Sequence, residues 1–309
     1  MTQLNKFVHG VTSVVGLPPG GKVLMSGQPS MLFWGNCQAR HLCRILKQVP
    51  YLTERYELAA FEFTPDPITG EYSVPDPELL SRCEWLYFNM PDNRLLPDFV
   101  HDFISKGRAL RFPVSLCPPL WPQHVTTIHA EPGFHWGRFP YGDLVLLDLI
   151  EKDFDDDRVL RKYLQMDFTA KYPLARSAEL WRYQLDKFDA VSDVKIADFV
   201  WSHFQRRQMF WTIYHATNEI FGHVLRLLFK RTIGDGVPED ELIPALRSIE
   251  LNNEMTPIHP SVVRYFNLTW VTDDLVYNSC EGPLRSEQWY AAYLQYIRAR
   301  QVRAAAASA

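Results

Sequence analysis

The sequence lacks the patterns that mark several large protein classes. Its five cysteines are odd in number and widely scattered, so none forms the close pairs found in zinc sites or redox motifs. They are Cys37, Cys43, Cys83, Cys117 and Cys280. Neither disulfides nor a structural metal is therefore expected, and no residue is assigned as a metal ligand.

Long apolar runs and an excess of one charge are also missing. No run approaches the roughly 20 apolar residues that a membrane-spanning helix needs, and residues 1–16 lack the apolar core of a signal peptide. The 32 basic and 36 acidic side chains leave a net charge of -4, which favours neither nucleic acid nor an anionic membrane. We expect a cytoplasmic protein with no nucleic-acid partner and no membrane insertion.

What the sequence does contain is a series of short apolar runs before residue 145. Each is bounded by turn-forming residues and separated from the next by enough chain for a crossover, as is typical of buried parallel strands. The runs are MLFWG, YELAAFEF, CEWLYFNM and ALRFPVSLCPP. The pattern predicts an α/β fold with a small parallel sheet and flanking helices in the N-terminal half.

The C-terminal half has the spacing of helices. Residues 155–232 contain little Gly or Pro, and the longest predicted helix runs from Val194 to Arg231. A shorter helix around DELIPALRSI, an irregular stretch and a final helix over 286–303 are expected to follow. No linker-like segment separates the halves, so we expect one continuous domain, with the sheet portion at 22–150 and a helical portion at 151–309 packed on it.

Cys37 stands where the first apolar run meets an amphipathic helix. Gly35 permits a tight turn, and Asn36 is a good N-cap, so Cys37 lies in the first helical turn. Cys37 and His41 lie away from the apolar stripe of that helix. The helix dipole and the nearby Arg40 would stabilise a thiolate there, and the backbone N–H groups could hold an oxyanion. The alternative is a small, buried and inert thiol.

Three blocks carry a resemblance to a known family. GNCQ after the first strand, FWTIYHATN, and TPIHPSVVRYFNLTW resemble the WcbI-type polysaccharide biosynthesis acetyltransferases of bacterial capsule clusters, from about Val23 to Trp270. The resemblance implies an O-acetyltransferase that uses acetyl-CoA to modify a capsular sugar, with an SGNH-hydrolase-like first block. Carried over, Cys37 is the nucleophile, and the turn of Gly35, Asn36 and Gln38 contributes to the oxyanion hole.

A cysteine nucleophile needs a base, and histidine is the usual one. His41 follows Cys37 by one helical turn, but its side chain would have to fold back. His215 lies in the predicted long helix with Thr212 and Asn218 as polar neighbours, although Ala216 replaces the proline common in the family. His259 precedes a proline in a loop. We rank His215 first and His259 second, and no orienting acid is identified.

Ligands of open α/β sheets bind beyond the carboxyl ends of the strands. The candidate substrate or coenzyme A contacts are therefore the polar groups of these loops and of the helices near them. They are Arg40, His41, Asn89, Asn93, Arg94, Trp121, Arg206, Arg207, Thr212, Asn218 and Arg264. Trp121 offers a flat face for a sugar or an adenine, and the arginines offer charge for phosphates. Lys230 and Arg231 are further basic candidates.

Three functions fit the sequence. The first is acetyl transfer from acetyl-CoA to a sugar, either with Cys37 as nucleophile and a histidine as base or with a histidine that activates the sugar hydroxyl directly. The second is a thiol hydrolase or sugar deacetylase. The third is a non-catalytic coenzyme A or glycan-binding protein in which Cys37 is inert.

Overall fold

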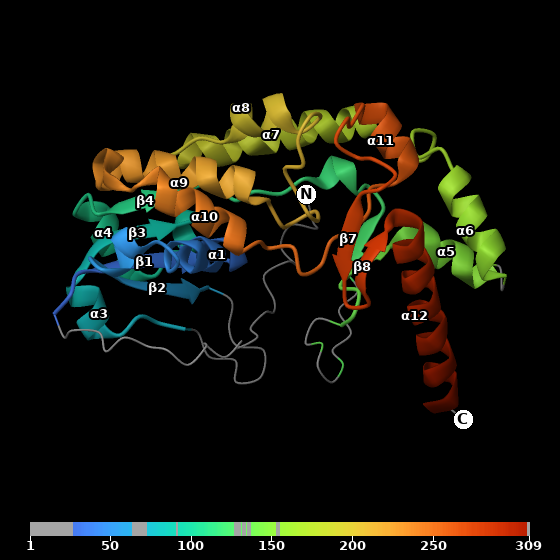
Figure 1. Cartoon of the computed structure of the whole chain (residues 1–309), viewed down its shortest axis with the longest axis horizontal. Coiled ribbons are helices and arrows are strands. Elements are labelled where there is room, and N and C mark those ends of the chain that lie inside the picture. The colour runs from blue at the N-terminus through green and yellow to red at the C-terminus, as the bar shows by residue number, and fades with distance from the viewer. Residues whose placement is uncertain are drawn as a thin grey trace. The chain divides into compact units, whose positions relative to one another are not determined.

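The computed structural model describes residues 27–63, 73–90, 92–126, 137–152 and 155–307, together with Glu131 and Phe134 (Figure 1). The predicted start of the sheet portion at residue 22 lies outside the described residues. The chain forms two compact units. The first contains the described residues up to Val114, Leu185–Asp198 and Asn218–Glu250, and the second contains Ser115–Gln184, Phe199–Thr217 and the described residues from Leu251 onward.

A four-stranded parallel sheet forms the centre of the first unit, in the order β2-β1-β3-β4. The strands are β1 (Ser30–Gly35), β2 (Glu57–Glu62), β3 (Cys83–Phe88) and β4 (Ala109–Arg111). The crossovers contain α1 (Cys37–Leu46), α2 (Pro50–Thr53), α3 (Pro77–Ser81), η2 (Asn93–Leu95) and α4 (Asp98–Ser105). β2, β3 and β4 lie within three of the four apolar runs, and β1 begins one residue before the run MLFWG, which confirms the predicted fold class.

Both faces of this sheet are covered. Leu32 and Trp34 of β1 point to one face, where they pack in one core with Leu79 of α3 and with Val100 and Phe103 of α4. Side chains alternate along a strand, so the neighbours of these two residues point to the opposite face.

On that opposite face the helices come from later in the chain. Phe33 contacts Tyr87 of β3, with ring centroids 5.1 Å apart, and the Tyr87 hydroxyl is 2.7 Å from that of Thr232 at the end of α9. The helices there are α9 (Asn218–Thr232), η4 (Gly234–Gly236) and α10 (Glu239–Ser248). Figure 1 shows α9 and α10 together beside α1.

The strand register brings the ends of β1, β2 and β3 to one edge of the sheet. Gly35 is paired with Glu62 at the end of β2, and Trp34 is paired with Phe88 at the end of β3. The residues that follow these ends, Asn36 and Asn89, therefore lie side by side.

The second unit is mostly helical, with two small antiparallel sheets. Its strands are β5 (His124–Thr126), β6 (Tyr141–Asp143), β7 (Val276–Ser279) and β8 (Gly282–Arg285). Its helices are η3 (Pro118–Leu120), α5 (Leu144–Lys152), α6 (Asp156–Gln165), α11 (Pro260–Phe266) and α12 (Ser286–Ala307). Two of the boundaries between the units fall within α7 (Leu174–Val191) and α8 (Ala197–His203).

A buried carboxylate joins several elements of the second unit. Asp143 accepts hydrogen bonds from the N–H groups of Val145 and Leu146, both at 2.9 Å, and from the Tyr163 hydroxyl. Burial raises the pKa of Asp143 to about 6. The carboxylate thus caps α5 and holds α6 against it.

The predicted helix from Val194 to Arg231 is wrong. The chain leaves the helix after α8 and resumes it only at Asn218, and between them Phe210 pairs with Ala216 in an isolated bridge. The Thr212 hydroxyl accepts the backbone N–H groups of Tyr214 and His215, at 3.3 and 3.1 Å, and so competes with helical hydrogen bonds.

One further element differs from the prediction and another matches it. The stretch expected to be irregular contains α11, capped by the His259 side chain, which accepts the Ser261 N–H. The final helix is confirmed as α12.

None of the helices in the described part of the chain is long and apolar enough to cross a membrane.

Candidate functional site

The turn between β1 and α1 is held by a pair of asparagines. The backbone N–H of Asn36 donates to Oδ1 of Asn89 at 3.0 Å, and Nδ2 of Asn89 donates to Oδ1 of Asn36 at 2.7 Å. The same Asn36 oxygen accepts the N–H of Gln38 at 3.0 Å, which is the predicted N-cap. Asn89, expected to contact a ligand, is almost fully buried and supports the turn instead.

Gly35 is needed for this arrangement because of space. A Cβ atom added there would stand 1.8 Å from Oδ1 of Asn89. The glycine therefore lets the end of β3 approach the turn, a reason that the sequence does not reveal.

Cys37 is the first residue of α1 and is partly exposed. Burial raises the pKa of its thiol to about 11, and the nearby Glu62 carboxylate adds to this rise. Arg40 and the backbone N–H groups of Gln38 and Cys37 act in the opposite direction. The resting side chain is therefore a thiol, contrary to the expected thiolate, and its sulfur lies close to N–H groups that could hold an oxyanion.

The charge of Arg40 is partly balanced by an ion pair, which weakens its action on the thiol or on a ligand. Its Nε lies 2.8 Å from Oε1 of Glu62, whose side chain is only 7% exposed. Glu62 was missed by sequence reasoning, because a single acid at the end of a strand carries no distinctive signal.

His41 lies on a buried face of α1, whereas the helical pattern had placed it away from the core. Its Nε2 is 2.9 Å from Oδ1 of Asn218, and its ring lies 4.9 Å from that of Phe221, both on α9. Burial lowers the pKa of His41 to about 4. α9 therefore covers the face of α1 that begins with Cys37.

Asn218 is fixed by the chain that follows α9. Its Nδ2 donates to the carbonyl oxygens of Leu246 and Ile249, the latter at 2.6 Å. Both His41 and Asn218 were predicted from the sequence to contact a ligand, but no sequence pattern indicated that they bond to each other.

His215 belongs to the second unit and lies in the non-helical stretch after α8. Its Nε2 is 3.2 Å from the Tyr141 hydroxyl, and it belongs to a cluster of half-buried aromatic side chains. Tyr141 contacts Tyr214, and both contact His124, whose pKa burial lowers to about 4. The predicted helical stripe with Asn218 does not exist.

His259 is fully buried, with both ring nitrogens occupied. Nδ1 is 2.8 Å from the Ser261 hydroxyl, and Nε2 is 2.9 Å from the Tyr163 carbonyl oxygen, to which it donates. The ring stacks on Phe168 at 3.7 Å, and burial lowers its pKa to about 4. These contacts favour a structural role in capping α11.

Several residues that were predicted to contact a ligand instead bond to other residues of the protein. The Trp121 indole N–H donates to the carbonyl oxygens of Thr256 and Pro257, at 3.0 and 3.2 Å, and its ring is buried, so no flat face is available for stacking. Thr212 is buried as well. Asn93 accepts a hydrogen bond from Arg111, and Arg94 forms an exposed ion pair with Asp92.

The remaining basic candidates are dispersed. Arg206, Arg207 and Arg264 are exposed in the second unit. Arg231 of the first unit donates to the Asp193 carbonyl oxygen at 2.7 Å, beside Lys230. The described residues contain no group of three or more His, Cys, Asp or Glu that could hold a metal ion.

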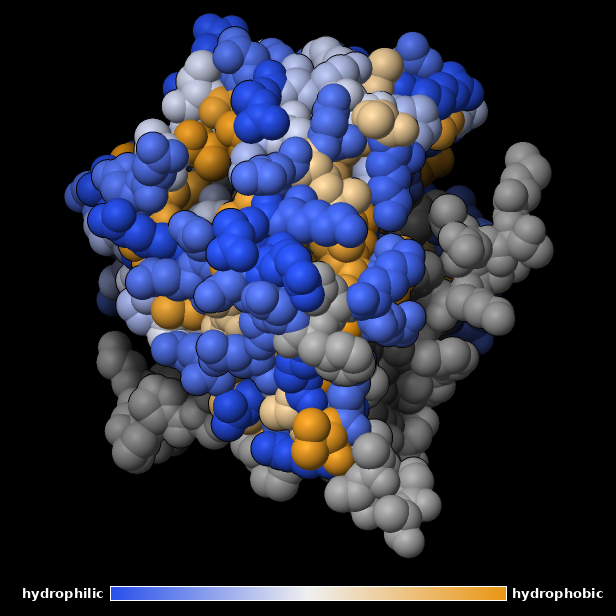
Figure 2. All heavy atoms as spheres, turned by 90° about the vertical axis from the view of Figure 1, so that its right-hand side faces the viewer, coloured by the Kyte–Doolittle hydropathy of each residue, from blue (hydrophilic) through white to orange (hydrophobic). Residues whose placement is uncertain are grey.

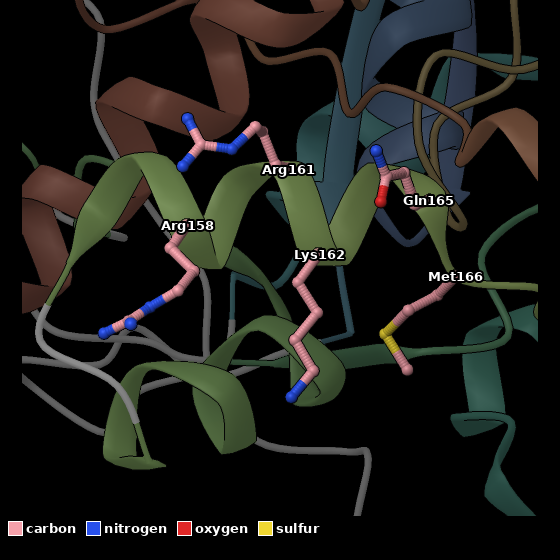
Figure 3. Close-up of a pocket in the computed structure, with 5 residues that line it drawn as sticks. All are labelled: Arg158, Arg161, Lys162, Gln165 and Met166. Atoms are coloured by element: carbon pink, nitrogen blue, oxygen red, sulfur yellow. The ribbon is translucent and has the colours of Figure 1, made fainter.

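A surface hollow of about 360 Å³ lies on α6 in the second unit (Figure 3). It is lined by Arg158, Arg161, Lys162, Gln165 and Met166. Figure 3 shows Arg158 and Lys162 leaving one side of the helix and Arg161 and Gln165 leaving the other, so the charges do not converge. The face of the second unit that carries α5, α6 and α12 is largely hydrophilic (Figure 2).

Comparisons with known proteins indicate the family and the fold of the chain. A family model described as the polysaccharide biosynthesis enzyme WcbI matches residues 30–232, more than half of the chain. A solved WcbI structure has a TM-score of 0.57 at 14% identity and covers 88% of this chain and 90% of its own. Its description mentions a disulfide bond between coenzyme A and a cysteine, absent in that native form. No curated protein matches the chain.

Proposed function

Because this chain belongs to the family of WcbI polysaccharide biosynthesis enzymes, we propose that it is an acetyl-CoA-dependent O-acetyltransferase. The acceptor is a hydroxyl group of a sugar in a bacterial capsular polysaccharide or its precursor. Cys37 is the nucleophile.

The position of Cys37 carries this proposal. Of the five thiols, only Cys37 and Cys280 are partly exposed, and only Cys37 begins a helix of ten residues that follows a parallel strand. The backbone N–H groups close to its sulfur are the kind of donors that stabilise a tetrahedral oxyanion. The Asn36–Asn89 pair keeps these groups in place.

The chemistry takes two steps. The Cys37 sulfur attacks the acetyl carbonyl carbon of acetyl-CoA, the bond to the coenzyme A sulfur breaks, and coenzyme A leaves as a thiol. A sugar hydroxyl then attacks the acetyl group on Cys37, and the cysteine thiol is restored. Coenzyme A involvement is supported by the solved WcbI structure, whose description names a disulfide between coenzyme A and a cysteine of that protein.

Intact-mass measurement after mixing with acetyl-CoA tests the proposal. We expect the protein to gain one acetyl group, and the Cys37→Ala variant to gain none. Cys280→Ala is the matched control, because Cys280 is also partly exposed and its thiol pKa is likewise raised to about 11. The control should acetylate like the wild type.

The acceptor is tested by following free coenzyme A with and without sugar. Transfer requires that release of coenzyme A depend on an added acceptor sugar, whereas steady release without one would indicate a hydrolase. Full turnover by Cys37→Ala would contradict the role of the cysteine.

A further inference from the structure

The hydrogen bonds around Asn218 fix the protonation state of His41. The Asn218 amide nitrogen donates to two carbonyl oxygens, so the atom that faces His41 is the amide oxygen, an acceptor. His41 Nε2 must therefore carry the hydrogen. Because burial keeps the ring neutral at neutral pH, Nδ1 holds a lone pair.

That Nδ1 atom is buried and has no hydrogen-bond partner among the described residues. Buried polar atoms are nearly always bonded, so an unpaired acceptor in a side chain that is only 1% exposed requires an explanation. The other ring nitrogen, Nε2, bonds to Asn218, and the ring lies 4.9 Å from that of Phe221.

The helix places this ring over the turn that begins with Cys37. His41 follows Cys37 by four residues in α1, so the two share a face. Side chains in a helix tilt toward its N-terminus, which brings the imidazole toward the cysteine. No hydrogen bond joins the two in the resting structure, as is common for catalytic pairs that tighten only when substrate binds.

We propose that His41 Nδ1 is the general base for Cys37, and that Asn218 is the positioning residue that holds the imidazole in the required tautomer. This rests on the proposed function. It replaces His215 and His259 as the base and gives a Cys-His-Asn arrangement built entirely within the first unit.

A base is required here because the thiol is not ionised in advance. In the first step the Cys37 proton moves to His41 Nδ1 as the sulfur bonds to the acetyl carbon. The same proton is then donated to the coenzyme A sulfur as its bond to carbon breaks. In the second step Nδ1 takes the proton of the sugar hydroxyl and returns it to the departing Cys37 sulfur.

Glu62 is the competing base, because it is the carboxylate whose charge raises the pKa of the Cys37 thiol. Its Oε1 already lies 2.8 Å from Nε of Arg40, in an ion pair that a proton on the carboxylate would break. The other charged groups that act on this region are Arg40 and Arg44, and both disfavour a charged imidazole.

The first experiment compares His41→Gln with His101→Gln, an exposed histidine of α4 in the same unit. Single-turnover acetylation of Cys37 is followed by mass, and coenzyme A binding is followed by thermal shift. We expect at least a hundredfold slower acetylation in His41→Gln with unchanged binding, and no change in His101→Gln. Wild-type acetylation by His41→Gln, or an equal loss in Glu62→Gln or His215→Gln, overturns the proposal.

A second measurement does not depend on acetyl transfer. Alkylation of Cys37 by iodoacetamide at pH 7, in a Cys280→Ala background, should be at least tenfold slower without His41. If the wild type fails to acetylate but shows this difference, the proposed function fails while the base stands. Equal alkylation rates overturn the base.

The role of Asn218 is tested by Asn218→Asp, which keeps the shape of the side chain. A carboxylate facing Nε2 favours the imidazolium, so the acid limb of the alkylation rate should move upward by one pH unit or more. An unchanged pH profile in a folded variant contradicts the positioning role.

Discussion

Asn36 and Asn89 bond to each other twice, through the backbone N–H of Asn36 at 3.0 Å and the amide nitrogen of Asn89 at 2.7 Å. Residues from two adjacent strand ends, 53 positions apart, thus form one rigid support beneath the first turn of α1. Because Cys37 follows directly, the position of its thiol depends on this pair.

Gly35→Ala should disturb the pair by steric overlap, and shortening Asn89 should remove the overlap with its side chain, leaving a close approach of 3.0 Å to the Cβ of Ala39. Asn89→Ala alone should cost about 1–3 kcal/mol, because the Asn36 N–H loses its acceptor. We expect the double variant to be more stable than the sum of the single effects predicts, by at least about 0.5 kcal/mol in urea unfolding. Additive effects would show that Gly35 and Asn89 do not interact.

Glu62→Gln should make the Cys37 thiol more acidic. The Glu62 carboxylate raises the pKa of the thiol, so its neutralisation lowers that pKa and frees Arg40 to act on the sulfur. Each unit of decrease raises the thiolate fraction about tenfold below the pKa. Alkylation at pH 8 in a Cys280→Ala background should therefore accelerate.

The matched control is Glu57→Gln, at the other end of the same strand and also paired with an arginine, Arg82. It should leave the alkylation rate unchanged. Equal acceleration in both variants would indicate loosening of β2 rather than an electrostatic effect.

His41 should give the protein a dependence of stability on pH. Its pKa is about 4 when folded and 6.5 in the unfolded chain, so between these values only the unfolded chain is protonated. Stability is then lost as the pH falls from 6.5 to 4, by about 3 kcal/mol from this group. The other shifted groups remain in His41→Gln and largely cancel in the comparison.

The stability difference between wild type and His41→Gln should therefore shrink as the pH falls from 7 to 4.5, as measured by urea unfolding. A difference that stays constant over this range would show that His41 titrates normally in the folded protein.

Trp121→Phe should affect stability and not acceptor binding. The change removes the indole N–H from two buried carbonyl oxygens, at a cost of about 1–3 kcal/mol. The KM for the acceptor sugar should stay the same, because the ring is buried. A raised KM with unchanged stability would restore the stacking role that the sequence suggested.

The local part of the site could be predicted from the sequence. Gly35, Asn36 and Cys37 follow an apolar run and precede an amphipathic helix, and short-range rules for turns and caps apply to such a stretch. Asn89 was placed at the correct sheet edge because it ends another apolar run. These features depend only on neighbours in the chain.

The long-range part could not be predicted. Helical spacing shows that His41 and Cys37 share a face, but not that α9 covers it. Likewise the helical pattern across 204–217 was overridden by the Thr212 hydroxyl and by burial of Phe210, because tertiary contacts outweigh weak local propensity.

The distance in sequence between His41 and Asn218, 177 residues, has a consequence for the order of events during translation. Cys37 and the neighbouring imidazole of His41 leave the ribosome early. The Asn218 amide that bonds to the imidazole, and the Leu246 and Ile249 carbonyls that accept hydrogen bonds from this amide, emerge only after most of the chain has been made. A nascent chain that has completed its parallel sheet still lacks this amide, so under the proposed mechanism ribosome-bound intermediates do not acetylate Cys37 until about residue 250 has been released.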